Sequence, residues 1–156
     1  MKITNTWKLI ITFVATFAAG AIGSLSTFSQ IPTWYLTLNK TVLTPPNWVF
    51  GPVWTTLYIL MAIAAFLVWK QSKNSKLALT FSGIQLALNA LWSILFFGNH
   101  FLLGAFIEIL FLLASIIATT VLFFRVSRPA GWMMVPYIAW VSFASILNFA
   151  VYLANR

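Results

Sequence analysis

The sequence predicts an all-α integral membrane protein, a bundle of five transmembrane helices with a long first extracytoplasmic loop. The 156 residues are 62% hydrophobic and only 6% charged, and a soluble chain of this length cannot bury so much apolar surface. The apolar residues form stretches of about 20, which is the length that crosses the hydrocarbon core of a bilayer. These stretches lack the two-residue alternation of a transmembrane β-barrel, so helices are expected.

The expected helices follow one another within a single domain, residues 1–156. They cover about residues 7–27, 48–69, 77–97, 102–124 and 131–153. A cleavable signal peptide is the alternative for the first stretch, because lysines precede it and Ala19-Gly20-Ala21 resembles a cleavage site. We favour a helix, because the stretch is long and Ala15, Ala19 and Gly23 form a ridge of small residues suited to helix packing or to a homodimer. Gly83 and Ala87 form a shorter ridge on the third helix.

Positive charges are distributed unequally between the two ends of the predicted bundle. Lys40 and Arg156 fall at one end, and the other seven cations fall at the opposite end: Lys2, Lys8, Lys70, Lys73, Lys76, Arg125 and Arg128. The cation-rich side of a membrane protein faces the cytoplasm, which places the N-terminus there and the C-terminus outside. We expect a prokaryotic plasma membrane, and a bacterial outer membrane is the alternative. The net charge of +8 is explained by these short connections and by anionic lipid, so no nucleic-acid partner is expected.

Side chains for conventional catalysis are few. One histidine (His100), one carboxylate (Glu108) and no cysteine cannot form a Ser-His-Asp or Cys-His set, a carboxylate pair or a multi-ligand metal site. We therefore assign no catalytic residue, no metal ligand and no required cofactor. His100 is interpreted as a plain loop residue and Glu108 as a structural group inside its helix.

Polar and aromatic side chains share faces on four of the predicted helices. Polar groups within a membrane span usually face the bundle interior or a cavity. The faces comprise Trp54 and Tyr58 on the second helix, Gln85, Asn89, Trp92 and Phe96 on the third, Glu108, Phe111, Ser115 and Thr119 on the fourth, and Trp140, Ala144 and the adjacent Asn148 on the fifth. Most of them fall in the outer half of the bundle. They predict an aromatic cavity that opens outward and suits a flat, largely apolar ligand, although plain helix packing is the alternative for each.

The segment before the second helix, TPPNWVFGPVWTTLY, predicts a stiff cover over this cavity. Pro45 and Pro46 fix their own φ and hold the preceding residues extended. Pro52 lies early in the helix, where a missing N–H is tolerated. We expect Trp34, Tyr35 and Trp48 to be held over the mouth of the cavity.

Three segments closely resemble the signature of the tryptophan-rich sensory protein family, TspO/MBR, whose animal relatives are the mitochondrial translocator protein or peripheral benzodiazepine receptor. They are WYLTLNKTVLTPPNWVFGPVWTTLY, LNALWSILFFG and VPYIAWVSFASILNFAVYLAN, in that order. The resemblance covers nearly the whole chain. It implies a five-helix membrane bundle, often homodimeric.

The resemblance also implies ligands and the residues that bind them. It implies binding of porphyrins such as protoporphyrin IX and haem, of sterols in some members, and of isoquinoline carboxamide and benzodiazepine drugs. The family's pocket positions fall on Tyr35, Trp54, Asn89, Trp92, Trp140 and Ala144. The chain departs from the family at Thr41, where proline is usual, and at Leu43, where tryptophan is usual, which predicts a less rigid and less aromatic cover.

A sterol motif of the family has a counterpart at the end of the fifth helix. Leu147, Tyr152 and Arg156 fit its spacing, but such a pattern is weak because apolar helices with basic ends are common.

Three functions remain open from the sequence. The leading hypothesis is a receptor or carrier of tetrapyrroles, acting in sensing, transport or porphyrin homeostasis. The alternatives are light-dependent oxidative breakdown of bound porphyrin, and a structural or partner-modulating membrane protein whose cavity holds lipid.

Overall fold

The computed structural model describes residues 3–71 and 75–156, so Lys2 and Lys73 of the charge argument lie outside the described residues. It contains five long helices: α1 (Asn5–Thr27), α3 (Asn47–Lys70), α4 (Ser75–Ser93), α5 (Leu102–Val126) and α6 (Arg128–Ala154). A π-helical turn, Ile94–Gly98, continues α4, and the short α2 (Trp34–Thr37) lies between α1 and α3. With the π-helical turn counted in α4, all five are long and apolar enough to cross a membrane.

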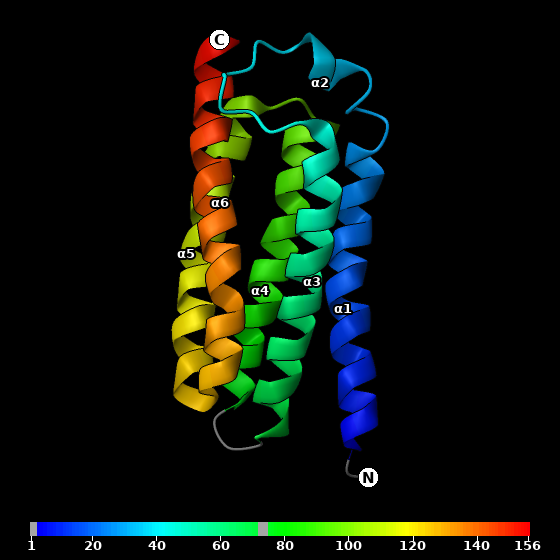
Figure 1. Ribbon diagram of the computed structural model, residues 1–156, viewed down its shortest axis with the longest axis vertical. Coiled ribbons are helices and arrows are strands. Elements are labelled where there is room, and N and C mark those ends of the chain that lie inside the picture. Colours follow the sequence, from blue (N-terminus) through cyan, green and yellow to red (C-terminus); the bar gives the residue numbers. More distant parts are fainter. Residues whose placement is uncertain (1–2, 72–74) are drawn as a thin grey trace.

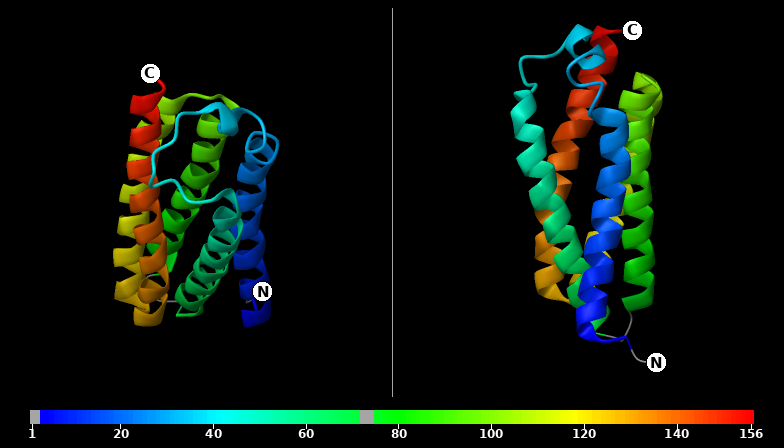
Figure 2. Two further views of the ribbon diagram at one scale, coloured as in Figure 1. Left: turned by 45° about the horizontal axis from the view of Figure 1, so that its top comes forward. Right: turned by 90° about the vertical axis from the view of Figure 1, so that its right-hand side faces the viewer.

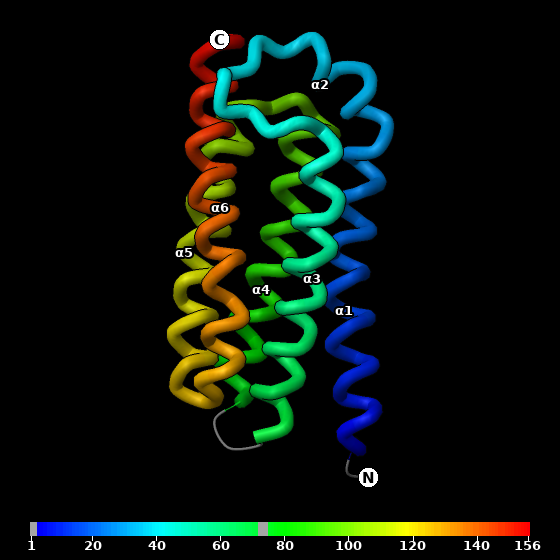
Figure 3. The backbone as a smooth tube through the Cα atoms, in the orientation of Figure 1, coloured from blue at the N-terminus to red at the C-terminus, as the bar shows by residue number. Residues whose placement is uncertain are grey.

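The helices run up and down beside one another, with the two termini at opposite ends of the bundle (Figure 1). α1 packs against α3 and α4, α4 packs against α5, and α6 packs against both α5 and α3. Residues 28–46, which include α2, pass over the end of the bundle that holds the C-terminus (Figures 2 and 3). We call residues 28–46 the roof.

The helix ends differ by only a few residues from those that hydropathy predicts. α6 shows the largest difference, because it begins at Arg128 rather than near residue 131. Pro129 is compatible with this earlier start, since the first turn of a helix has N–H groups that form no intrahelical bond. Pro52 behaves differently from the prediction: it is the sixth residue of α3, where its missing N–H removes a bond to the Trp48 carbonyl.

Small residues allow the helices to approach one another closely. Ala62, Ala64, Ala105 and Ala130 are completely buried. Between apolar helices in a bilayer, such close packing replaces the hydrophobic driving force that folds soluble proteins. On α1, Gly20 lies directly under the Tyr58 ring, where an added Cβ would stand 2.6 Å from Tyr58 Cε2.

This contact gives a test of the α1–α3 packing. We expect Gly20→Ala to lower the free energy of unfolding by about 1–3 kcal/mol, the usual cost of overpacking, because the Tyr58 ring must move. Gly51→Ala on α3 is the matched control, since a Cβ added at Gly51 would meet nothing within 4 Å. Denaturant unfolding in detergent measures both. Equal stabilities for Gly20→Ala and the wild type would contradict the packing described here.

Candidate ligand-binding site

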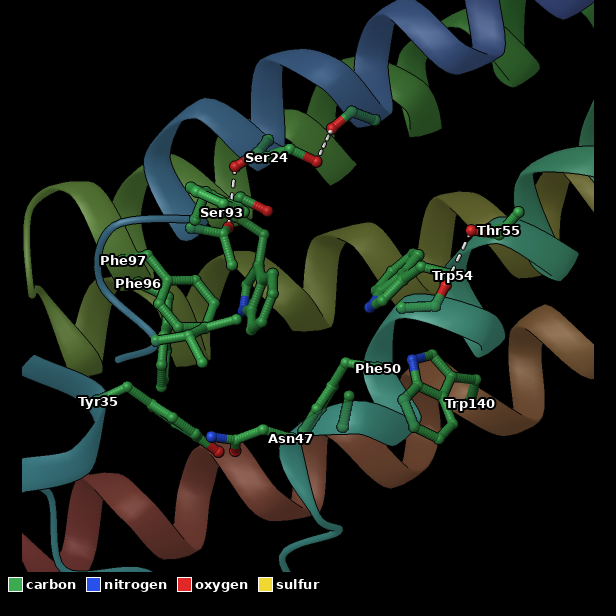
Figure 4. Close-up of a pocket in the computed structure, with 18 of the residues that line it drawn as sticks. Ser24, Tyr35, Asn47, Phe50, Trp54, Thr55, Ser93, Phe96, Phe97 and Trp140 are labelled. Carbon is green, nitrogen blue, oxygen red and sulfur yellow. Dashed lines mark hydrogen bonds between the residues drawn. The ribbon is translucent and has the colours of Figure 1, made fainter. Parts of the chain in front are cut away.

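One cavity of about 520 Å³ lies at the roof end of the bundle, between α1, α3, α4 and α6. Its walls are mainly aromatic rings and small residues (Figure 4). Among the described residues, its lining contains no lysine, arginine, histidine or carboxylate. The volume falls within the range of about 300–1,000 Å³ typical of small-molecule sites.

Aromatic rings form two sides of the cavity. On one side, Trp54 stacks on Tyr58 with ring centroids 5.5 Å apart, and Trp140 packs edge-to-face on Phe50 at 6.0 Å. On the other side, Trp92 stacks on Phe96 at 5.3 Å. In Figure 4, Trp54 and Trp140 lie together across the open space from Phe96 and Phe97. A flat ligand between these sides would meet rings on both of its faces.

A buried hydrogen-bond network fixes one of these sides. Tyr58 donates its hydroxyl hydrogen to Asn89 Oδ1 at 2.8 Å, and Asn89 Nδ2 donates to the Tyr137 hydroxyl at 2.9 Å. Trp54 packs on both tyrosine rings, stacked on Tyr58 and edge-on to Tyr137 at 6.1 Å. The network therefore joins α3, α4 and α6 and sets the position of Trp54.

A second hydrogen bond orients the opposite side. Trp92 Nε1 donates to Asn148 Oδ1 at 2.9 Å, and Asn148 Nδ2 donates to the Leu102 carbonyl at 3.4 Å. The polar groups of Trp92 and Asn148 thus already have hydrogen-bond partners within the protein. In contrast, no hydrogen bond joins the indole N–H of Trp54 or Trp140 to another described residue, and both rings line the cavity. These two N–H groups are available to a ligand.

The π-helical turn brings two consecutive rings into the cavity. Asn99 N–H bonds to the Ile94 carbonyl, five residues earlier, at 2.8 Å. Phe96 and Phe97 fall within this turn, and both are buried and line the cavity. Single π-helical turns are frequent at functional sites because the extra residue re-aims side chains.

The roof is attached to the bundle at two places. Near its start, Trp34 stacks on His100 at 4.0 Å, and His100 Nε2 lies 3.0 Å from Gln30 Oε1. Near its middle, Asn39 and Asn155 form reciprocal hydrogen bonds of 2.9 and 3.0 Å. Four roof residues belong to the cavity lining: Phe28, Ile31, Tyr35 and Thr44.

The structure brings most of the predicted site residues together. The ones that line the cavity are Tyr35, Trp54, Tyr58, Trp92, Trp140, Ala144 and Asn148. Asn89 lies directly behind Tyr58 and supports it rather than lining the space. Trp34 is outside the lining because its ring packs against His100 and Phe96. Trp48, expected over the mouth, is 75% exposed and does not line the cavity.

Other lining residues did not stand out in the sequence. They include Phe17, Ser24, Asn47, Phe50, Ser93 and Phe97. Phe50 precedes Trp54 by four residues and was detectable from helical spacing. Ser93 meets α1 at Gly23, where an added Cβ would stand 2.9 Å from Ser93 Oγ. The Gly23 end of the α1 ridge therefore packs within the bundle, a contact that one helix alone does not reveal.

Several residues discussed above lie away from the cavity. Glu108 is buried in α5, and neither of its carboxyl oxygens has a hydrogen-bond partner among the described residues. Of the sterol-motif residues, Leu147 lines the cavity, whereas Tyr152 and Arg156 do not. Gly83 and Ala87 lie on an exposed face of α4.

The fold and the site together define a membrane protein of five helices with an aromatic cavity beneath a connecting segment. The chain belongs to the TspO/MBR family, whose model matches residues 11–153, and the resemblance seen in the sequence is confirmed. It is 42% identical to a tryptophan-rich protein TspO of Archaeoglobus fulgidus, over 97% of this chain and 99% of that protein. It is 44% identical to protein CrtK of Rhodobacter capsulatus, over 92% and 89%. It is 36% identical to the human translocator protein, over 86% and 82%.

The Asn89 network predicts a measurable loss of stability. Asn89→Leu should lower the free energy of unfolding by about 1–3 kcal/mol, because the Tyr58 and Tyr137 hydroxyls lose their buried partner. Thr80→Ala on the same helix is the control, since the exposed Thr80 hydroxyl donates to the Lys76 carbonyl of its own helix and to no other described residue. Unfolding followed by circular dichroism measures both variants, and an Asn89→Leu protein as stable as the control would show that the network carries no net stabilisation.

Proposed function

We propose that the chain is a receptor or carrier-like membrane protein that binds a tetrapyrrole, protoporphyrin IX in the first place, for sensing, transport or porphyrin homeostasis. The observation that carries the proposal is the cavity walled by Trp54 and Trp140 on one side and by Trp92 and Phe96 on the other. Flat apolar molecules gain most from such walls, because ring stacking adds to the burial of apolar area.

The lining favours metal-free porphyrin over haem. Histidine, cysteine and methionine are the usual protein ligands of haem iron, and none of them is found among the described lining residues. Tyrosine is the remaining haem ligand type, and the cavity holds Tyr35 and Tyr58. Tyr58 already donates its hydroxyl hydrogen to Asn89, and burial raises the pKa of Tyr35, which keeps its phenol neutral. Haem is therefore the weaker candidate.

We further propose that the roof end of the bundle faces outward from a prokaryotic plasma membrane. The described cations at the opposite end are Lys8, Lys70, Lys76, Arg125 and Arg128, against Lys40 and Arg156 at the roof end. The excess at the N-terminal end supports a cytoplasmic N-terminus. In this orientation the roof is the long extracytoplasmic loop that the sequence predicts, and the cavity receives its ligand from the outer half of the membrane.

Porphyrin titration of the purified protein tests the proposal. We expect protoporphyrin IX to quench tryptophan emission saturably in the dark, because four indole rings lie in or near the cavity: Trp34, Trp54, Trp92 and Trp140. Absence of saturable quenching would contradict tetrapyrrole binding. The same sample under light examines the degradation hypothesis, for which loss of the porphyrin absorption bands is the signature.

The walls of the cavity predict which substitutions weaken this binding. Trp54→Leu and Trp140→Leu should each raise the Kd for protoporphyrin IX about two- to tenfold, since aromatic pairing contributes about 0.5–1.5 kcal/mol beyond the burial of apolar area. Phe at either position should recover part of the affinity, because it restores a ring. Trp132→Phe is the control, since Trp132 is 66% exposed and packs on Phe124 away from the cavity. Kd values from porphyrin absorption that are unchanged in the Leu variants would place the ligand elsewhere.

We also propose that two copies associate through α4. Gly83 and Ala87 lie on its exposed face, and a Cβ added at Gly83 would meet nothing within 4 Å. Small residues at this spacing let two membrane helices approach closely. Gly83→Leu should reduce the dimer fraction measured by chemical cross-linking in detergent, whereas Ala18→Leu on the exposed face of α1 should not. A dimer fraction that is equal in the two variants would rule out this face.

A further inference from the structure

The cavity offers no charge to a charged ligand. The hydroxyls of Ser24, Thr27 and Thr55 in the described lining donate to carbonyl groups of their own helices. The Thr44 hydroxyl has no partner among the described residues, but it is a neutral group and supplies no positive charge. A carboxylate placed deep in this space would lose its hydration without gaining a cation. A ligand that carries a carboxylate must therefore hold it at an edge of the cavity, next to a cation outside the lining.

Lys40 is a cation that contacts a residue of the cavity lining. Its Nζ lies over the ring of Tyr35, 4.5 Å from the ring centroid, and Tyr35 is a lining residue. The ammonium is attracted by the face of the ring, which keeps it in contact with a residue of the cavity lining. Figure 4 shows the Tyr35 hydroxyl turned toward Asn47, so this part of the roof borders the open space.

The backbone next to Lys40 is fixed to α6. Asn39 N–H donates to Asn155 Oδ1 at 2.9 Å, and Asn155 Nδ2 donates to the Asn39 carbonyl at 3.0 Å. The Asn39 side chain also donates to the Ala154 carbonyl at 3.3 Å. The same helix supplies Ala144, Leu147, Asn148 and Val151 to the cavity. The backbone that carries Lys40 is therefore hydrogen-bonded to the end of a helix that lines the cavity.

No residue that the structure describes neutralises the charge of Lys40. The single acidic side chain of the chain, Glu108, is buried in α5. No ion pair joins Lys40 to any residue that the structure describes, and burial raises the pKa of Tyr35, so its phenol is no anion. Arg156 is the other described cation at this end, and it follows Asn155 directly.

We propose that Lys40 pairs with a carboxylate at the edge of the bound ligand, so that the site selects molecules with a flat apolar body and an anionic rim. The inference rests on the proposed tetrapyrrole binding and adds to it the group that orients the ligand: the apolar macrocycle lies between the rings, and the acid groups point to the roof. Neutral flat molecules of equal size bind less tightly.

Paired ligands that share one macrocycle but differ in the charge of their acid groups test this inference. The probes are protoporphyrin IX and its dimethyl ester, titrated in neutral detergent against the wild type, Lys40→Met and Lys40→Arg. We expect the wild type and Lys40→Arg to prefer the free acid about fivefold, the upper range for a solvent-exposed ion pair. Lys40→Met should lose the preference while it keeps its affinity for the ester. Lys70→Met at the opposite end and Arg156→Gln at the same end are the controls.

Each outcome separates this inference from the proposed function. Equal affinity of the wild type for acid and ester would overturn the role of Lys40 and leave tetrapyrrole binding intact, whereas binding of neither would remove the proposed function itself. A Lys40→Met variant that loses both ligands equally would show a structural role in the roof. A preference that follows Arg156 instead would overturn the assignment to Lys40. A last outcome concerns lipid. If Lys40→Met weakened the binding of phosphatidylglycerol but left the preference for the free acid unchanged, the lysine would be assigned to a lipid phosphate and the inference would be overturned.

Discussion

The hydrogen bonds of Asn89 are the interaction on which the site depends. Apolar helices in a bilayer gain little from simple contact, so polar bridges between helices and close packing decide their arrangement. Asn89 binds Tyr58 of α3 and Tyr137 of α6 from its own position on α4. The rings of both tyrosines then support Trp54. One buried amide therefore sets the spacing of three helices and the orientation of a cavity wall.

The roof adds what the helices cannot supply. The helices contribute rings and small residues, which provide apolar area and shape but no charge. Residues 28–46 close the end of this space and bring Lys40 to its border, held through Asn39 and Asn155. The cation lies on the roof and not among the apolar walls, where burying an unpaired charge would cost much free energy. Apolar contact and ionic selection are in this way assigned to different parts of the chain.

Much of this architecture could be predicted from the sequence, since hydropathy and helical spacing depend on local composition. The five helices and the shared face of Asn89 and Trp92 followed directly from these patterns. The partners of those residues did not, because Tyr137 lies on another helix, 48 residues from Asn89 in the sequence, and only the tertiary packing brings the two together. The π-helical turn at Phe96 and Phe97 has no sequence signature. Trp34 was predicted to be a cavity residue, but its ring stacks on that of His100, which is distant in the sequence.

Locating the bound tetrapyrrole is the measurement that tests the central claim most directly. Crystals grown with metal-free protoporphyrin IX would show the position of the macrocycle as electron density. The account predicts one macrocycle between Trp54 and Trp92, with the acid groups toward Lys40. A macrocycle on the outer, lipid-facing surface of the bundle, with the cavity occupied by lipid, would contradict it.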